Sequence, residues 1–253
     1  MSKAQKPKQR QSKKRKILIT LAVILSVLAL IFAACAAYVC DYYRADVAAI
    51  ANYETEGKIT VTTGELGMAF LPENPQTGLI FYPGGKVEHT AYVPLMQALA
   101  SKGILCVLPE MPLRLAVLNA DAADGIKELY PAVTTWYIGG HSLGGSMAAS
   151  YLSEHAAEFE GLVLLASYST ADLSATDLSV LSVYGKEDGV LDLEKYAECK
   201  GNLPADTTEH VLAGGNHAYF GMYGKQKGDG EAALTPADQI GQTAELIAAF
   251  MNL

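Results

Sequence analysis

A run of 23 residues without a charged side chain, residues 17–39, divides the chain into two parts that need different surroundings. Leu, Ile, Val and Ala dominate this run, and about 20 such residues are enough for a helix to cross the hydrocarbon core of a bilayer. The apolar run of a cleaved secretory signal is usually only about 7–15 residues long. The sequence therefore predicts a retained transmembrane helix that contacts the lipid bilayer.

The charges beside this run predict its orientation. Residues 1–16 contain eight Lys and Arg and no acidic residue, and basic flanks stay on the cytoplasmic side of a membrane. We therefore predict a single-pass protein of the cell membrane, with residues 1–16 cytoplasmic and the remainder extracytoplasmic. Two alternatives stay open: cleavage at the small residues Ala34-Cys35-Ala36, or lipid attachment at Cys35.

The rest of the chain is acidic. All 27 acidic residues lie from Asp41 onward, where they accompany only 11 of the 19 basic residues and give this part a net charge of −16. Nucleic-acid binding depends on neutralising phosphates with basic side chains, so no nucleic-acid partner is predicted. Half of the residues are hydrophobic and 18% are charged, a composition that excludes a disordered chain.

Apolar runs and helical patterns alternate after a juxtamembrane segment, residues 40–57, in which a short helix over 41–52 is expected. Strands are predicted at 59–63, 68–71, 79–82, 104–108, 135–138, 162–166, 179–184 and 208–212. Helices are predicted at 92–102, 120–130, 143–155, 193–199 and 237–250. Several of the strands are continuous apolar runs, as expected when helices cover both faces of a sheet. Residues 58–253 are thus predicted to form one α/β domain with a mostly parallel sheet.

The chemistry is concentrated in Gly139-Gly140-His141-Ser142-Leu143-Gly144-Gly145. This Gly-x-Ser-x-Gly pattern lies between a predicted strand and a predicted helix, where a strained turn would expose the Ser142 hydroxyl at the carboxyl edge of the sheet. The Leu143 amide opens the helix and is a candidate donor to an oxyanion. The alternative is a glycine-rich turn of a Rossmann-like unit, with Ser142 only capping the helix.

A serine hydroxyl needs a base and an orienting acid to act as a nucleophile near neutral pH. His217, in the glycine loop before the final helix, is the candidate base. Asp188, just past the strand predicted at 179–184, is the candidate acid, and Glu187 is its nearest rival. The ordinary alternatives are a surface-loop histidine and a solvated aspartate in a turn.

The other histidines are weaker candidates for the base. His141 precedes Ser142 and is expected to point away from it, and His89 follows a glycine loop where it is conceivable as a substrate contact. The acidic residues Asp188, Asp192 and Glu194 lack the oxygen-ligand pattern and central glycine of a calcium loop. No metal site is predicted, and no phosphate-binding glycine motif implies a nucleotide cofactor.

The order Ser142, Asp188, His217, with each residue after a successive strand, resembles the α/β-hydrolase superfamily. Four blocks carry the resemblance, which covers roughly residues 58–253: Phe81-Tyr82-Pro83-Gly84-Gly85-Lys86-Val87, Gly139-Gly140-His141-Ser142-Leu143-Gly144-Gly145, Tyr184-Gly185-Lys186-Glu187-Asp188-Gly189 and Gly214-Gly215-Asn216-His217-Ala218-Tyr219-Phe220-Gly221. They are similar to those of a small bacterial branch of poorly characterised α/β-hydrolases.

The resemblance implies a sheet of eight strands, with Ser142 as nucleophile, Asp188 as acid and His217 as base. It also places a second oxyanion donor after the strand at 79–82, where the amide of Gly85 or Lys86 is the candidate. An ordinary turn is the alternative for that segment, and the Lys86 charge would either steer an acidic substrate or pair with Glu88.

The superfamily commonly inserts a cap between the strands predicted here at 162–166 and 179–184. Only 12 residues, 167–178, separate them, too few for a helical cap, since one stable helix uses about 11. The sequence thus predicts a capless, membrane-anchored serine hydrolase that acts on a small acyl substrate through an acyl-enzyme. An acyltransferase with the same residues and a catalytically silent, surface-displayed binding protein are the alternatives.

Overall fold

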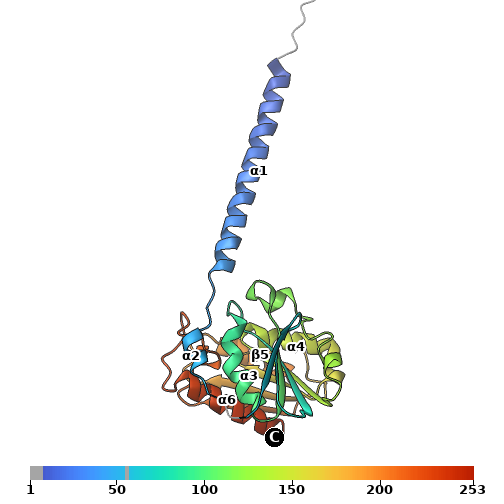
Figure 1. Ribbon diagram of the computed structural model, residues 1–253. Coiled ribbons are helices and arrows are strands. Elements are labelled where there is room, and N and C mark those ends of the chain that lie inside the picture. The colour runs from blue at the N-terminus through green and yellow to red at the C-terminus, as the bar shows by residue number, and fades with distance from the viewer. Residues whose placement is uncertain (1–7, 55–56) are drawn as a thin grey trace, which may run out of the picture. The chain divides into compact units, whose positions relative to one another are not determined.

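The computed structural model describes residues 8–54 and 57–253 (Figure 1). The chain divides into two compact units, with the division between Tyr42 and Tyr43. The first seven residues of the predicted basic tail, and residues 55–56 of the predicted juxtamembrane segment, lie outside the described residues.

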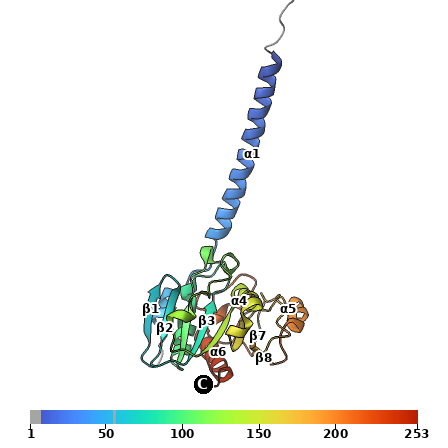
Figure 2. The ribbon, with the colours of Figure 1, turned by 90° about the vertical axis from the view of Figure 1, so that its right-hand side faces the viewer.

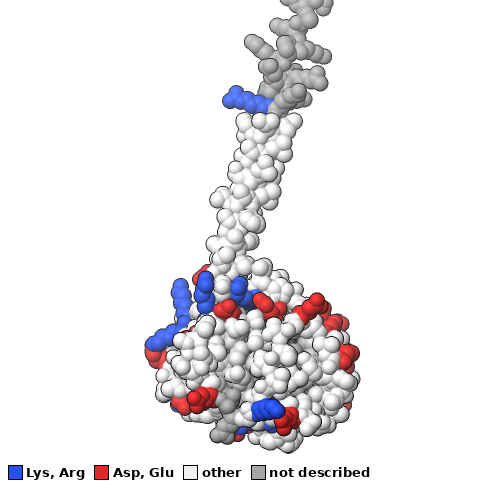
Figure 3. Space-filling view, viewed as in Figure 1, with Lys and Arg blue, Asp and Glu red and all other residues white. Residues whose placement is uncertain are grey.

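The first unit is formed by one long helix, α1 (Lys8–Cys40). Within it, Arg15–Cys40 is long and apolar enough to cross a membrane, with a mean hydropathy of 3.0. The space-filling view shows no acidic or basic side chain along the middle of this helix (Figure 3). A helix of 26 residues is about 39 Å long, which exceeds the roughly 30 Å of a bilayer core. This one apolar helix is consistent with a single-pass membrane anchor.

The second unit is built on an eight-stranded sheet with the order β1-β2-β4-β3-β5-β6-β7-β8. Its strands are β1 (Thr60–Gly64), β2 (Gly67–Leu71), β3 (Thr77–Tyr82), β4 (Ile104–Leu108), β5 (Thr135–His141), β6 (Gly161–Leu165), β7 (Ser179–Gly185) and β8 (Thr207–Leu212). The β1–β2 and β2–β4 pairs are antiparallel, and every other pair is parallel. The predicted α/β architecture with a mostly parallel sheet is confirmed (Figure 2).

Helices cover both faces of this sheet. They are α2 (Val47–Ala51), α3 (Val93–Ala100), α4 (Leu143–His155), α5 (Leu193–Cys199) and α6 (Pro236–Phe250). Short 3-10 helices connect them: η1 (His89–Tyr92), η2 (Pro112–Arg114), η3 (Ala116–Leu118), η4 (Lys127–Leu129), η5 (Ala156–Glu158), η6 (Lys200–Asn202) and η7 (Ala218–Phe220).

Alternate side chains of β3 enter two separate cores, because successive residues of a strand point to opposite faces. Leu79 and Phe81 pack in the cluster that includes residues of α3 and α6. Ile80 and Tyr82 pack in the cluster that includes residues of α4. Burial on both faces explains why the sequence of β3 is a continuous apolar run.

The prediction of a helix at 120–130 is wrong. The segment is a series of short turns with i to i+3 hydrogen bonds, and only Lys127–Leu129 is a 3-10 helix. The Tyr82 hydroxyl donates to the Ala120 carbonyl at 2.7 Å and accepts from the Ala123 amide at 2.9 Å, so a side chain takes the place of helical partners. Gly125 has φ +74°, which a right-handed helix does not allow.

The segment that enters the second unit is largely extended rather than helical. The expected helix over 41–52 is limited to Val47–Ala51, which Asp46 caps by accepting from the Ala49 amide at 2.9 Å. Before it, the Tyr43 amide donates to the Lys86 carbonyl at 2.8 Å, and the Glu88 amide donates to the Tyr43 carbonyl at 2.9 Å. Tyr43 is therefore the point at which the chain becomes fixed to the body.

Removal of the Tyr82 hydroxyl tests how the 120–130 segment is held. We expect Tyr82→Phe to lower the free energy of unfolding by about 1–3 kcal/mol, because one buried and one partly buried backbone group lose their partner. The measurement is denaturant unfolding of the detergent-solubilised chain. Tyr137→Phe is the control, since no hydrogen bond joins the Tyr137 hydroxyl to another described residue, and this hydroxyl is not one of their buried, unpartnered polar atoms. Equal stability of the two variants would contradict this account.

Candidate active site

Ser142 occupies a sharp turn between β5 and α4. Its backbone has φ +52° and ψ −123°, a conformation that costs a non-glycine residue about 1–3 kcal/mol. Two hydrogen bonds hold the turn: the Ser142 amide donates to the Leu165 carbonyl at 2.9 Å, and the Ser167 hydroxyl donates to the Ser142 carbonyl at 2.7 Å. The turn presents Ser142 beyond the carboxyl end of β5, as the sequence predicts.

The glycines around Ser142 are required by close backbone packing. A Cβ atom at Gly144 would lie 2.2 Å from the Tyr82 carbonyl oxygen and 2.4 Å from that of Pro83. A Cβ atom at Gly140 would lie 2.6 Å from the same Tyr82 oxygen and 2.6 Å from the Gly144 carbonyl carbon. The Gly-x-Ser-x-Gly pattern therefore lets the start of α4 approach the end of β3.

The structure brings His217 and Asp188 together from two different loops. His217 Nδ1 lies 2.9 Å from Asp188 Oδ2, and the two side chains are only 2% and 1% exposed. Glu187, the rival acid, is exposed to solvent. A buried carboxylate at Nδ1 favours a proton on that nitrogen, which leaves Nε2 free to accept a proton.

Hydrogen bonds from backbone amides hold Asp188, the candidate acid, in place. Asp188 Oδ1 accepts from the amides of Val190 and Leu191 at 2.8 and 2.7 Å. The loop that carries the acid also touches the loop that carries the base, since the Glu187 amide donates to the Gly215 carbonyl at 2.8 Å. The other carboxylate oxygen therefore remains directed at His217.

Asp229, which was not among the residues predicted from the sequence, ties the same two loops together. Its Oδ1 accepts from the amides of Gly189, His217 and Gly230 at 3.1, 3.2 and 2.9 Å. Its Oδ2 accepts from the Ala218 amide at 2.8 Å. The Asp229 carboxylate thus connects Gly189, which follows Asp188, with His217 and Ala218. The sequence contained no signal for this role, because Asp229 lies in a polar loop with no motif.

His141 packs directly behind the candidate base. Its ring centroid lies 4.6 Å from that of His217. The sequence predicts only that His141 points away from Ser142, and it does not predict this contact. The Tyr92 hydroxyl accepts from the Gly84 amide at 3.0 Å and shares a second hydrogen bond with His141 Nδ1 at 2.8 Å. Among the described residues, His141 Nε2 has no hydrogen-bond partner. Burial, with a smaller effect of charge on His217, lowers the pKa of His141 well below 6.5.

The candidate oxyanion donors are placed differently from one another. The Leu143 amide is at the first residue of α4. Gly85 lies so close to the Leu143 side chain that a Cβ atom on Gly85 would be 2.9 Å from Leu143 Cδ2. The Lys86 amide, however, donates to the Arg114 carbonyl at 2.8 Å. Because its hydrogen is already engaged, Lys86 is a wrong candidate for the second donor, which leaves Gly85.

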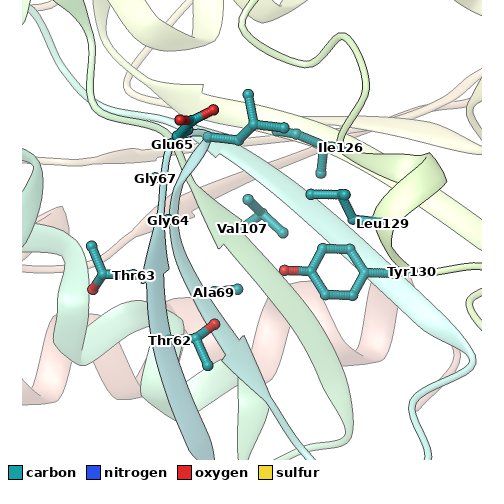
Figure 4. A pocket seen from close by; sticks show the side chains of 11 residues that line it. Thr62, Thr63, Gly64, Glu65, Gly67, Ala69, Val107, Ile126, Leu129 and Tyr130 are labelled. Atoms are coloured by element: carbon teal, nitrogen blue, oxygen red, sulfur yellow. The ribbon is translucent and has the colours of Figure 1, made fainter.

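A cavity of about 250 Å³ adjoins these residues. It is lined by Ser142, Leu143, Ser146, Ala166, Ser167, Tyr168, Val190, Leu191, Asp192 and His217. A larger hollow of about 320 Å³ lies at the β1–β2 edge of the sheet (Figure 4), but none of the candidate site residues lines it. Converging polar groups outweigh size in locating an active site, so the smaller cavity is the candidate.

Ser142 and His217 line this cavity together without a hydrogen bond between their side chains in the described part of the chain. Such contacts are often long in a ligand-free enzyme and shorten when substrate binds. Across the described residues, no group of three or more His, Cys, Asp or Glu side chains is placed to hold a metal ion.

Comparisons with known proteins agree with this fold. A model of the alpha/beta hydrolase family matches residues 78–241, a span that contains Ser142, Asp188 and His217. Among solved structures, the chain is similar to one described as a predicted CIB-like hydrolase from Thermoplasma acidophilum, with a TM-score of 0.57 and 14% identity over 78% of this chain and all of that one. At this identity the likeness concerns the fold. No curated protein matches the chain.

Burial of His141 predicts a loss of stability in mild acid. The unfolded chain binds a proton near pH 6.5, whereas the folded chain leaves His141 neutral, so the free energy of unfolding should fall as the pH drops below about 6.5. The fall is at most about 1.4 kcal/mol per pH unit. Nuclear magnetic resonance should show the His141 ring unchanged between pH 7 and 5 while free histidine, measured in parallel, becomes protonated. A His141 that is protonated in step with free histidine would contradict the assignment.

Proposed function

Because the chain belongs to the alpha/beta hydrolase family, which supports a hydrolase, we propose that it is a membrane-anchored serine hydrolase that cleaves a carboxylic ester or a related acyl bond. The observation that carries the proposal is the buried pair of His217 and Asp188, 2.9 Å apart, at the cavity that Ser142 also lines. The apolar helix of Arg15–Cys40 is the proposed anchor, with residues 1–16 in the cytoplasm and the catalytic body outside.

The proposed reaction begins with attack of Ser142 Oγ on the substrate carbonyl carbon. His217 Nε2 takes the hydroxyl proton, and Asp188 stabilises the imidazolium that results. The negative charge on the carbonyl oxygen is stabilised by the amides of Leu143 and Gly85. His217 then gives its proton to the leaving group, which departs as the C–O bond breaks and the acyl-enzyme remains on Ser142.

Water completes the proposed cycle. His217 Nε2 takes a proton from a water molecule, whose oxygen attacks the acyl carbon, and the proton then returns to Ser142 Oγ as the acid product leaves. The same residues would support acyl transfer if an alcohol or amine replaced water. A catalytically silent binding protein is disfavoured because it has no need of a buried acid–base pair beside a strained serine.

The proposed site is open on its substrate side. Residues 167–178, where the superfamily commonly inserts a cap, form turns and irregular backbone without a helix. This segment supplies Ser167 and Tyr168 to the wall of the cavity and has no helix that could form a cap. An acyl substrate would therefore reach Ser142 without the movement of a lid domain.

Substitution of the three proposed catalytic residues tests the function. On p-nitrophenyl acetate, Ser142→Ala, His217→Ala and Asp188→Asn should each lower kcat by on the order of 10⁴. The double variant of Ser142 and His217 should be no slower than either single variant, because the residues act as a unit. Ser153→Ala, an exposed position on the same helix α4, is the matched control. Activity that survives Ser142→Ala in a folded chain would reject the serine mechanism.

Asp229 is expected to act by positioning the base. Asp229→Ala should lower kcat about 10- to 100-fold through displacement of His217, with little change in KM because Asp229 does not line the cavity. Asp229→Asn keeps one acceptor oxygen and should fall between Asp229→Ala and the unchanged chain.

Asp238→Ala is the matched control for Asp229. Asp238 caps helix α6 by accepting from the Thr235 hydroxyl and amide, so its loss should cost about 1 kcal/mol of stability and leave kcat unchanged. If Asp229→Ala lost only stability, with kcat as in the control, the positioning role would be wrong.

A further inference from the structure

Between β4 and β5, the body exposes large apolar side chains that nothing in it covers. Leu113, Val117 and Leu118 are 54%, 56% and 53% exposed, and they lie within six residues of sequence. Leu113 has φ +51° and its neighbour Arg114 has φ +61°, so the chain adopts costly conformations in the loop that presents these side chains. Isolated exposed apolar residues are ordinary, but a cluster of them marks an interaction surface.

The composition of this loop differs from that of the body around it. Residues 111–118 contain one Arg and no acidic residue, although the body as a whole is strongly acidic. Apolar side chains beside a basic one are typical of segments that lie in the interface of a membrane. Within residues 111–118 there is no carboxylate to repel anionic lipid headgroups, and the nearest acidic residue in the sequence is Glu110, which directly precedes the loop.

Hydrogen bonds connect the loop to the point where the chain enters the body. The Lys86 amide donates to the Arg114 carbonyl at 2.8 Å, and the Tyr43 amide donates to the Lys86 carbonyl at 2.8 Å. Val47, which is 75% exposed, follows Tyr43 by four residues. The apolar loop is therefore linked through Lys86 to the point at which the chain enters the body.

The sequence limits how far this surface can be from a membrane. Only Asp41 and Tyr42 separate the end of the apolar helix at Cys40 from Tyr43. Three steps of about 3.8 Å between Cα atoms allow a reach of about 11 Å, whatever the direction of the connection. When the helix spans a bilayer, Tyr43 must therefore lie at or just outside the headgroup layer, which is about 5–8 Å thick on each side.

We propose that Val47, Leu113, Val117 and Leu118, here called the apolar rim, contact the interface of the bilayer in which the chain is anchored. The proposal rests on the proposed function, since it needs both the anchor and the hydrolase. The short connection argues for lipid rather than for a protein partner, because Tyr43, to which the loop is linked through Lys86, stays within about 11 Å of the end of the apolar helix.

The loop that carries Leu113, Val117 and Leu118 is linked through Lys86 to the proposed active site. Lys86, which is bonded to the loop, directly follows Gly85, and Gly85 packs against Leu143 at the start of α4. A body that rests on the bilayer through the rim would therefore hold its oxyanion donors next to the headgroup layer. The substrate class that fits this position is an amphiphilic ester whose acyl carbonyl lies at the membrane surface.

Lipid contact is tested with the full chain in phosphatidylcholine vesicles that contain doxyl-labelled lipid. Cys35→Ala and Cys40→Ala remove the exposed thiols, while Cys106 and Cys199 are buried. A fluorophore attached to V117C should shift its emission to the blue and be quenched by the labelled lipid. The same fluorophore on V211C, an exposed position on β8 at the far edge of the sheet, should show neither change.

A second measurement links the contact to activity. The triple substitution of Leu113, Val117 and Leu118 by Ser should lower the rate on a long-chain ester presented in vesicles at least about tenfold, because apolar area no longer enters the interface. The rate on water-soluble p-nitrophenyl acetate should be unchanged, which also shows that the variant folds.

The outcomes separate the proposals. Equal quenching at V117C and V211C would overturn lipid contact and leave the rim to a protein partner. A wild-type chain that fails to float with vesicles would overturn both the anchor and the rim. Quenching at V117C without hydrolysis of either ester would reject the hydrolase and keep the lipid contact. An equal loss of rate on both esters in the triple variant would contradict the link between the rim and the substrate.

Discussion

The backbone of Gly140 and Gly144 lies against the end of β3 so closely that one methyl group at either glycine would overlap the Tyr82 carbonyl oxygen. This packing fixes the start of α4 over the sheet and forces the turn at Ser142 into a left-handed conformation. Ser142, the Leu143 amide and the glycine loop after β3 consequently meet at one edge of the sheet. The proposed chemistry depends on this contact because it sets the position of Ser142 before any substrate arrives.

A second set of constraints brings His217, the candidate base, to that edge. Asp188 and His217 come from loops that touch through the Gly215 carbonyl and are joined by the Asp229 carboxylate. Behind them, His141 is buried, and burial lowers its pKa well below the usual value. The candidate base His217 therefore packs against the His141 ring on one side and is hydrogen-bonded to the Asp188 carboxylate on the other.

The sequence predicted the parts of the fold that follow from hydrophobic periodicity, and it failed where single side chains redirect the backbone. The buried strands and α4 were predictable because their patterns are local. The helix expected at 120–130 was not formed, because the Tyr82 hydroxyl and Gly125 impose turns. The Lys86 amide could not be excluded as an oxyanion donor from sequence, since its bond to Arg114 joins loops 28 residues apart. Asp229 was missed for the same reason.

Labelling with a fluorophosphonate tests the central claim, that Ser142 is a nucleophile activated by His217, most directly. Such a reagent reacts with a hydroxyl that a neighbouring base has activated, and peptide mass spectrometry locates the adduct. The account predicts a single adduct on Ser142 in the full chain, lost in Ser142→Ala and much slower to form in His217→Ala. A folded chain that stays unlabelled, or that is labelled equally well without Ser142, would contradict it.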